Sequence, residues 1–115
     1  MNVVSDMSQA FVYGLQIEVR VRGTTTTIAL RGEWDLAGQP GIRRAIGDVL
    51  ADPPERLVLD LSGLCFMDAG GLRSTVELAR RAAAMNVSLS IVPGPRAVQR
   101  IFDLCQVSGL PWDER

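Results

Sequence analysis

The sequence predicts a single α/β domain with a mixed β-sheet of about four strands and helices packed after an opening hairpin. Three observations lead to this fold class. Two strand-like segments follow each other closely, at residues 15–22 and 25–31. Helix-like and strand-like segments then alternate as far as residue 105, as in βαβ units with right-handed crossovers. The chain has 115 residues, of which 47% are hydrophobic, so it suffices for one domain with its own core.

The domain is expected to span residues 15–110. Residues 1–14 mix small, polar and apolar residues without a clear period, so they are expected to form a loosely held arm. Residues 111–115 are expected to be a short tail. No internal repeat or low-complexity segment divides the region between them.

The opening hairpin follows from alternation. Apolar and polar residues alternate over residues 15–22, which is typical of a half-buried strand. Gly23-Thr24 forms a turn, and the β-branched segment Thr25–Arg31 predicts a second strand that ends at Gly32. So short a turn predicts antiparallel pairing.

The first helix is expected to begin at Pro40, because proline suits the first turn of a helix. It ends before Pro53 and Pro54, since two prolines cannot continue a helix. Its apolar residues recur on one face: Ile42, Ala45, Ile46, Val49 and Leu50.

The segment from Leu57 to Met85 is the centre of the predicted fold. Leu57–Leu61 is almost wholly apolar, so it is predicted as a strand covered on both faces. Residues 63–71 are predicted as a turn that leads into a helix capped by Asp68. The apolar face of this helix is expected to comprise Leu72, Val76, Ala79 and Ala83. The opposite face carries Arg73, Glu77, Arg80 and Arg81.

A strand and a helix complete the domain. Asn86 ends the central helix, and residues 87–92 predict another apolar strand. Pro93-Gly94-Pro95 turns the chain into a last helix, which ends at residues 108–111. The apolar face of this helix comprises Val98, Ile101, Phe102 and Cys105.

The turn before the central helix is the candidate functional region, because open α/β sheets place their functional surface at the carboxyl ends of the strands. Gly70 and Gly71 are each less favourable than Ala in a helix by about 1 kcal/mol. Two explanations of the pair are open. It allows either a tight strand-to-helix connection or close approach by another backbone or an anion at the helix N-terminus.

Composition excludes several classes of function. A net charge of −1 provides no basic field for nucleic acid or anionic lipid. Without His, metal catalysis and Ser-His or Cys-His mechanisms lack their usual partner, so no metal, cofactor or enzymatic activity is expected. All 12 basic residues are Arg, which pairs bidentately with carboxylates and suits a protein-binding surface. No targeting signal and no long apolar run is evident, so a cytoplasmic protein without membrane insertion is expected.

The cysteines Cys65 and Cys105 have two explanations. Their spacing does not suggest a zinc site. Cys65 has apolar neighbours and Cys105 falls on an apolar helix face, so packing as reduced, apolar residues is the simpler expectation. The alternative is a redox role, in which oxidation couples the turn to the last helix; a disulfide needs Cα atoms within about 7 Å.

Four segments, in this order, resemble the STAS domain of bacterial anti-sigma factor antagonists. They are Gly32–Leu36 (GEWDL), Leu57–Leu64 (LVLDLSGL), Phe66–Leu72 (FMDAGGL) and Val98–Leu104 (VQRIFDL). Because the four occur together and in order, the resemblance is more specific than any single motif.

The resemblance implies a small cytoplasmic module that binds an anti-sigma factor, usually an ATPase-type serine kinase, and so frees a sigma factor. It also implies a switch, namely phosphorylation of a Ser or Thr directly after the aspartate that matches Asp68. Here the acceptor position is Ala69 and the next is Gly70, and neither has a hydroxyl. The phosphate switch is therefore expected to be absent at this place. Ser74 and Thr75 are expected to be ordinary surface helix residues.

The implied partner-binding residues surround this turn. They are Asp35, Asp68, Ala69, Gly70, Gly71 and Leu72. Asp35 is equally well explained as a cap before the first helix. Many STAS domains continue beyond the position of Arg115, so part of a sheet edge or an opposite face is expected to need covering, either by Trp112 or by a homodimer.

Two functions of different classes are compatible with these residues. The leading one is an anti-sigma factor antagonist. The alternative is a solitary STAS subunit of a lipid-transport ATPase system, since the corresponding loop in such subunits often lacks a phosphorylatable pair. An enzyme has least support, because no nucleophile, base and orienting group converge in the sequence.

Overall fold

The computed structural model describes the backbone of residues 7–12 and 14–113 and the side chains of residues 14–113. Within these residues lies a five-stranded sheet whose strand order is the order along the chain. The strands are β1 (Met7–Val12), β2 (Leu15–Arg22), β3 (Thr25–Trp34), β4 (Arg56–Met67) and β5 (Ser88–Val92). Neighbours are antiparallel from β1 to β3 and parallel from β3 to β5. The predicted α/β domain with a mixed sheet is confirmed.

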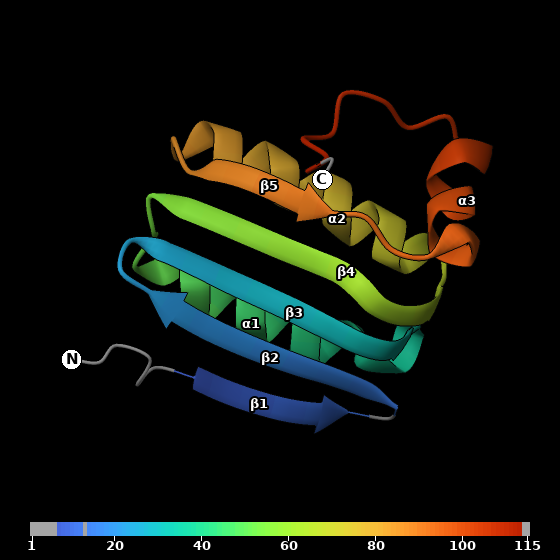
Figure 1. Cartoon of the computed structure of the whole chain (residues 1–115), viewed down its shortest axis with the longest axis horizontal. Helices are drawn as coiled ribbons and strands as arrows, with labels where there is room; N and C mark the ends of the chain where they lie inside the picture. Colours follow the sequence, from blue (N-terminus) through green and yellow to red (C-terminus); the bar gives the residue numbers. More distant parts are fainter. Residues whose placement is uncertain (1–6, 13, 114–115) are drawn as a thin grey trace.

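Helices connect the strands after the hairpin. They are the short 3-10 helix η2 (Leu36–Gly38) and the α-helices α1 (Gln39–Ala51), α2 (Ala69–Ala84) and α3 (Arg96–Leu104). Figure 1 shows α1 and α2 on the same face of the sheet, whereas α3 lies beside the end of β4. None of the helices in the described part of the chain is long and apolar enough to cross a membrane.

β1 lies where the sequence indicated a loosely held arm. It pairs with β2 over its whole length, from Met7 opposite Arg20 to Val12 opposite Leu15. Without β1, the outer edge of β2 would present unpaired backbone groups. This pairing uses the backbone and requires no periodic side chains, so alternation did not indicate it. The sheet therefore has five strands rather than about four.

β3 and β4 extend further than the sequence pattern indicated. β3 continues past Gly32 to Trp34, and β4 includes residues 63–67, which were predicted as part of a turn. The two strands remain paired to their ends, where Trp34 lies opposite Met67. The turn before α2 is therefore shorter than predicted, and it begins at the very end of two paired strands.

The prediction stopped β4 too early because its pairing with β3 is irregular. Ala29 pairs with Asp60, but Arg31, two residues later, pairs with Gly63, three residues later. A second shift of the same kind follows Gly32. Each shift places one additional residue in β4 and interrupts the alternation of inward and outward side chains. A segment with this pattern reads as a turn from sequence alone.

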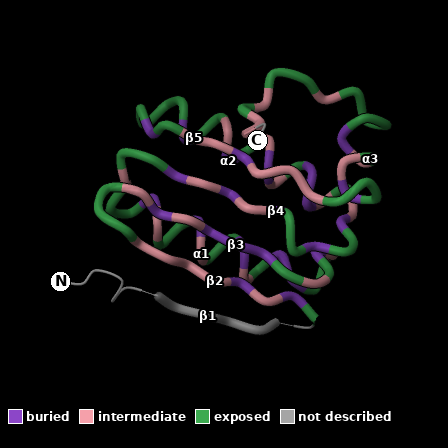
Figure 2. Tube along the Cα trace, in the orientation of Figure 1, coloured by how far each residue is buried: buried purple, intermediate pink, exposed green. Residues whose placement is uncertain are grey.

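The core lies between the sheet and the helices, and Figure 2 shows buried residues concentrated in β3 and β4. Leu57, Leu59 and Leu61 of β4 are buried, but Val58 and Asp60 on the other face are only half-buried. The expectation of a strand fully covered on both faces is thus wrong for one face, because α1 and α2 cover the same side. The predicted face of α1 is confirmed by its buried residues, Ile42, Ile46 and Leu50.

The buried face of α2 is rotated relative to the prediction. Its buried side chains are Leu72, Thr75, Leu78 and Ala82. Val76 and Ala79 are half-buried, and Ala83 is exposed. Thr75 enters the core because its hydroxyl donates a hydrogen bond to the Gly71 carbonyl at 2.9 Å, which satisfies the polar group. Because Thr75 was counted as a surface residue, the predicted apolar face was rotated relative to the buried face of α2. The charged face is confirmed, since its four residues are exposed.

The last helix and the following segment close the other edge of the sheet. Val98 and Phe102 of α3 are buried, and the Trp112 ring packs edge-on against Phe102 with centroids 4.9 Å apart. Ile91 of β5 donates its N–H to the Pro111 carbonyl at 2.9 Å, and Trp112 forms an isolated parallel bridge with Ile91. The expected covering of an edge by Trp112 is therefore confirmed, while a homodimer remains a prediction.

Candidate functional site

The candidate site begins where two parallel strands end side by side. The Asp68 N–H donates to the Trp34 carbonyl at 3.1 Å, so Asp35 and Asp68 follow adjacent strand ends. Asp68 caps α2 as predicted, since its Oδ1 accepts from the Gly71 N–H at 3.1 Å. Asp35 caps η2 by accepting from the Ala37 N–H at 3.1 Å. The structure thus places two capping carboxylates side by side at the carboxyl ends of β3 and β4.

The two glycines of the turn differ in role. Gly71 is buried, and a Cβ there would overlap Met67 and lie 3.1 Å from Cδ2 of Trp34. Only glycine allows α2 to start this close to the core, which is the tight-connection explanation. Gly70 is half-buried, and a Cβ there would lie 2.5 Å from Nε2 of Gln39. Gly70 therefore leaves room for a neighbouring side chain.

Gln39 is a site residue that the sequence reasoning missed. It is buried at 6% exposure, and its Oε1 accepts from the Trp34 indole N–H at 3.3 Å and from the Ser74 hydroxyl at 3.0 Å. One amide therefore joins β3, α1 and α2. No sequence signal indicated this role, because the partners lie 5 and 35 residues away and no motif specifies a lone glutamine.

The predicted partner-binding residues are only in part accessible. Ala69 is exposed, whereas Asp68 and Gly70 are half-buried. Gly71 and Leu72 are buried, and Leu72 is 7% exposed. Leu72 therefore belongs to the core. A partner that docks on this turn meets mainly Ala69 and, in part, Asp68 and Gly70.

Neither hydroxyl further along α2 is a free surface group. Ser74 is half-buried and donates to Gln39, and Thr75 is fully buried and donates to Gly71. The expectation that both are ordinary surface residues is wrong, because each hydroxyl has a structural partner. The exposed position at the start of the helix is Ala69, whose methyl group cannot accept phosphate.

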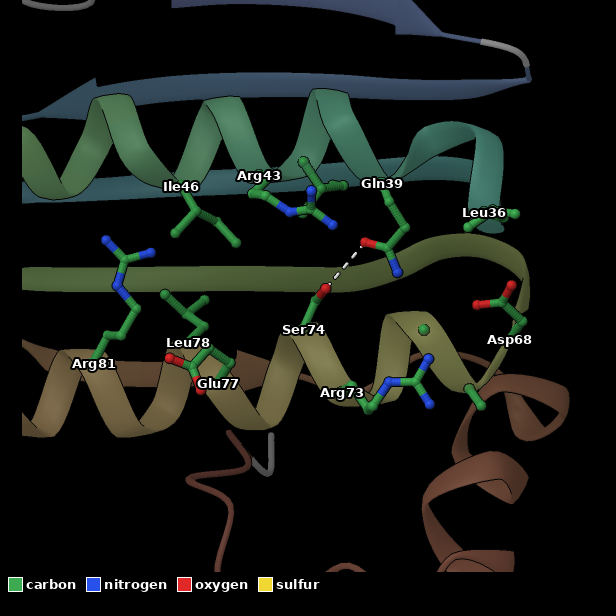
Figure 3. A pocket seen from close by; sticks show the side chains of 13 residues that line it. Leu36, Gln39, Arg43, Ile46, Asp68, Arg73, Ser74, Glu77, Leu78 and Arg81 are labelled. Carbon is green, nitrogen blue, oxygen red and sulfur yellow. Dashed lines mark hydrogen bonds between the residues drawn. The ribbon is translucent and has the colours of Figure 1, made fainter.

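A groove of about 690 Å³ runs between α1 and α2 and includes the turn at one end (Figure 3). Its floor is apolar and consists of Ile42, Ile46 and Leu78, all buried. Leu36 stands at the end near the turn and is 80% exposed. The sequence reasoning placed the contact surface on Asp35 and on the turn from Asp68 to Leu72, and so missed the wall that α1 provides.

Both cysteines are free and exposed. The packing explanation is therefore wrong for each of them. Cys65 lies at the second irregularity of β4, where its thiol donates a weak hydrogen bond to the Gly32 carbonyl at 3.4 Å. Cys105 directly follows the last residue of α3 and so leaves the apolar face of that helix. A redox role for the pair remains a prediction.

Comparison with known proteins places these features in a family context. The family model described as "Mlab, STAS domain" matches residues 17–111. The anti-sigma-F factor antagonist RsfB of two Mycobacterium tuberculosis strains is 34% identical over 59 residues, which cover 51% of this chain and 48% of the relative. The match thus spans about half the length of these curated relatives.

Two solved structures share the fold. An anti-sigma factor antagonist from Mycobacterium paratuberculosis superposes with a TM-score of 0.74 at 22% identity, over 97% of this chain and 89% of the other. The anti-sigma factor antagonist SpoIIAA in its unphosphorylated form gives a TM-score of 0.65 at 18% identity, over 87% and 80% of the two chains. At such identities the likeness concerns the fold.

Proposed function

This chain belongs to the STAS domain family, and from that premise we propose that it is an anti-sigma factor antagonist, a cytoplasmic binding protein rather than an enzyme. It binds an anti-sigma factor of the ATPase-type serine kinase class and so frees a sigma factor. Similarity to RsfB, whose name describes it as an anti-sigma-F factor antagonist, supports the antagonist role. The observation that carries it is the exposed start of α2, which Asp68 caps at the carboxyl end of β4.

The direct test is binding to the ATPase-type anti-sigma proteins of the source genome. Each purified protein is titrated with this chain by calorimetry, and release of sigma factor is followed on a preformed sigma–anti-sigma complex. We expect one of them to bind with a Kd of about 1 μM or lower and to release its sigma factor. Binding to none of them would contradict the proposal.

The first prediction concerns phosphate transfer. Incubation with the cognate kinase and ATP is expected to leave the intact mass of this protein unchanged, because Ala69 and Gly70 carry no oxygen nucleophile. The hydroxyls of Ser74 and Thr75 are engaged inside the fold. The matched control is Ala69→Ser, which restores a hydroxyl at the exposed position and should gain one phosphate. A phosphopeptide that contains Ser74 or Thr75 would show that another switch exists.

The second prediction concerns the contact surface. Ala69→Glu is expected to weaken binding of the anti-sigma factor by about 2 kcal/mol, since it places a charged side chain at the exposed start of α2. The fold should be retained, because a carboxylate in the first turn of a helix is favourable. Gly70→Glu is a poorer test, as its Cβ would displace the buried amide of Gln39.

Ala97→Glu provides the matched control, because Ala97 is likewise exposed near the start of a helix, but on α3. This variant should bind as the unmodified protein does. If both variants are folded, as judged by circular dichroism, and bind with equal affinity, the contact surface does not include the turn.

A second candidate function is a solitary STAS subunit of a lipid-transport ATPase system. The lack of a hydroxyl at positions 69 and 70 favours it, and the family description names the STAS domain without an anti-sigma role. Co-purification from cells that express the tagged chain separates the two functions. A transport ATPase among the retained proteins, with no anti-sigma factor, would favour the second.

A further inference from the structure

We propose that the groove between α1 and α2 binds an acidic segment of the partner protein. An apolar side chain of this segment packs on the groove floor, and its carboxylates pair with the arginines of the groove. The identity of that partner as an anti-sigma factor rests on the proposed function. The preference for an acidic segment rests on the groove itself.

Three arginines line the groove, and all are exposed: Arg43 on α1, and Arg73 and Arg81 on α2. The salt bridges within residues 14–113 join other residues, so these three guanidinium groups have no carboxylate partner in that part of the chain. Figure 3 shows Arg43 on the wall opposite Arg73, and Arg81 further along the groove. Positive charge is therefore spread along both walls.

Two carboxylates also line the groove, Asp68 and Glu77, and they offset the charge of the three arginines only in part. Asp68 keeps its negative charge, although its Oδ1 accepts the Gly71 N–H. Glu77 is paired at 2.9 Å with Arg80, which lies outside the groove lining. The whole chain has a net charge of −1, so the positive groove is a local feature and does not follow from composition.

The spacing of the arginines predicts how far apart the carboxylates of the bound segment lie. Arg73 and Arg81 are eight residues apart on α2, which corresponds to about 12 Å along the helix axis. Matching carboxylates would lie about eight residues apart on a helical segment, or about four apart on an extended one. A single small anion cannot reach both groups. The planar guanidinium forms bidentate pairs with carboxylates, which favours Asp and Glu side chains as ligands.

The apolar floor requires that this acidic segment be amphipathic. Ile46 and Leu78 lie in the groove between the arginines of the two walls. Leu36 at one end exposes 80% of its surface, so it adds an apolar side chain that a bound segment can contact. A segment with Leu or Phe between two acidic residues satisfies both the floor and the walls.

The main test is the double charge reversal Arg73→Glu/Arg81→Glu, measured by titration with the anti-sigma factor that binds the unmodified protein. We expect a loss of affinity of about 100-fold or more, because two attractive contacts become repulsive. The matched control is Arg96→Glu/Arg100→Glu on α3, which makes the same change of charge at exposed positions outside the groove. The control should lose less than about threefold. Equal losses in the two variants would overturn the proposal.

A second test does not depend on the anti-sigma factor. The probe is a synthetic helical peptide with two Glu residues eight positions apart and Leu between them, compared with the same peptide carrying Lys in place of Glu. The acidic peptide should shift the backbone amide resonances of α1 and α2 in the unmodified protein, and the Lys peptide should not. Absence of this difference would overturn the acidic preference.

The tests also separate failure of this proposal from failure of the proposed function. If no anti-sigma factor binds but the acidic peptide shifts α1 and α2, the function fails and the groove proposal holds. If an anti-sigma factor binds and Arg73→Glu/Arg81→Glu loses no more affinity than Arg96→Glu/Arg100→Glu, the groove proposal fails and the proposed function holds. Retention of the protein on phosphatidylglycerol vesicles, lost in Arg73→Glu/Arg81→Glu, would assign the groove to lipid and overturn the proposal.

Discussion

Replacing Trp34 with Ala is expected to lower the free energy of unfolding by about 3–5 kcal/mol. Trp34 is fully buried, its ring lies against Gly71 at the start of α2, and its indole N–H donates to Gln39. Removing the ring leaves a cavity between β3 and α2 and deprives the Gln39 amide of one partner. Urea unfolding followed by far-ultraviolet circular dichroism measures the loss.

Trp34→Phe separates the two contributions of Trp34. Phenylalanine retains most of the ring volume but cannot donate to Gln39, so it should cost about 1–3 kcal/mol. If the two substitutions lowered the free energy of unfolding equally, the packing of the Trp34 ring against Gly71 would not contribute to stability.

Gly32→Ala is expected to destabilise the protein by about 3 kcal/mol, or to prevent folding. Gly32 has a φ of +96°, and a Cβ there would overlap the backbone carbonyl oxygen of Gly14. That oxygen accepts the N–H of Glu33 at 3.1 Å, so neither backbone can move aside without losing this hydrogen bond. Thermal unfolding provides the measurement.

Gly14→Ala is the matched control for this substitution. Gly14 has a similar φ of +89°, but nothing lies within 4 Å of a Cβ built on it. Its cost should therefore be that of the left-handed conformation alone, about 1 kcal/mol. Equal costs at the two positions would show that the close approach of the two backbones contributes nothing.

Features that depend on near neighbours in the chain were predicted well. The Asp68 cap involves a residue three positions away, and the apolar face of α1 repeats every three or four residues. Local chemistry is sufficient for such features. The pairing of the β2–β3 hairpin was confirmed for the same reason.

Features that depend on distant residues were missed. Gln39 is defined by Trp34 and Ser74, the latter 35 residues away, and the burial of Thr75 depends on where α2 rests on the sheet. The irregular pairing of β4 with β3 hid the last residues of both strands. The turn was found because its glycines and aspartate are local signals. The groove was not, since its two walls come from helices that no pattern relates.

The order of the strands has a consequence for folding. Among the residues that the structure describes, each strand pairs only with strands that are its neighbours in the chain. None of these pairings requires closure of a loop longer than one βαβ crossover. Such a sheet should fold faster than a sheet of the same size that pairs strands further apart in the chain. It can also assemble in the order of synthesis. The helices α1 and α2 would then be in place before α3 and the Trp112 segment leave the ribosome, so a nascent chain can present its binding face early.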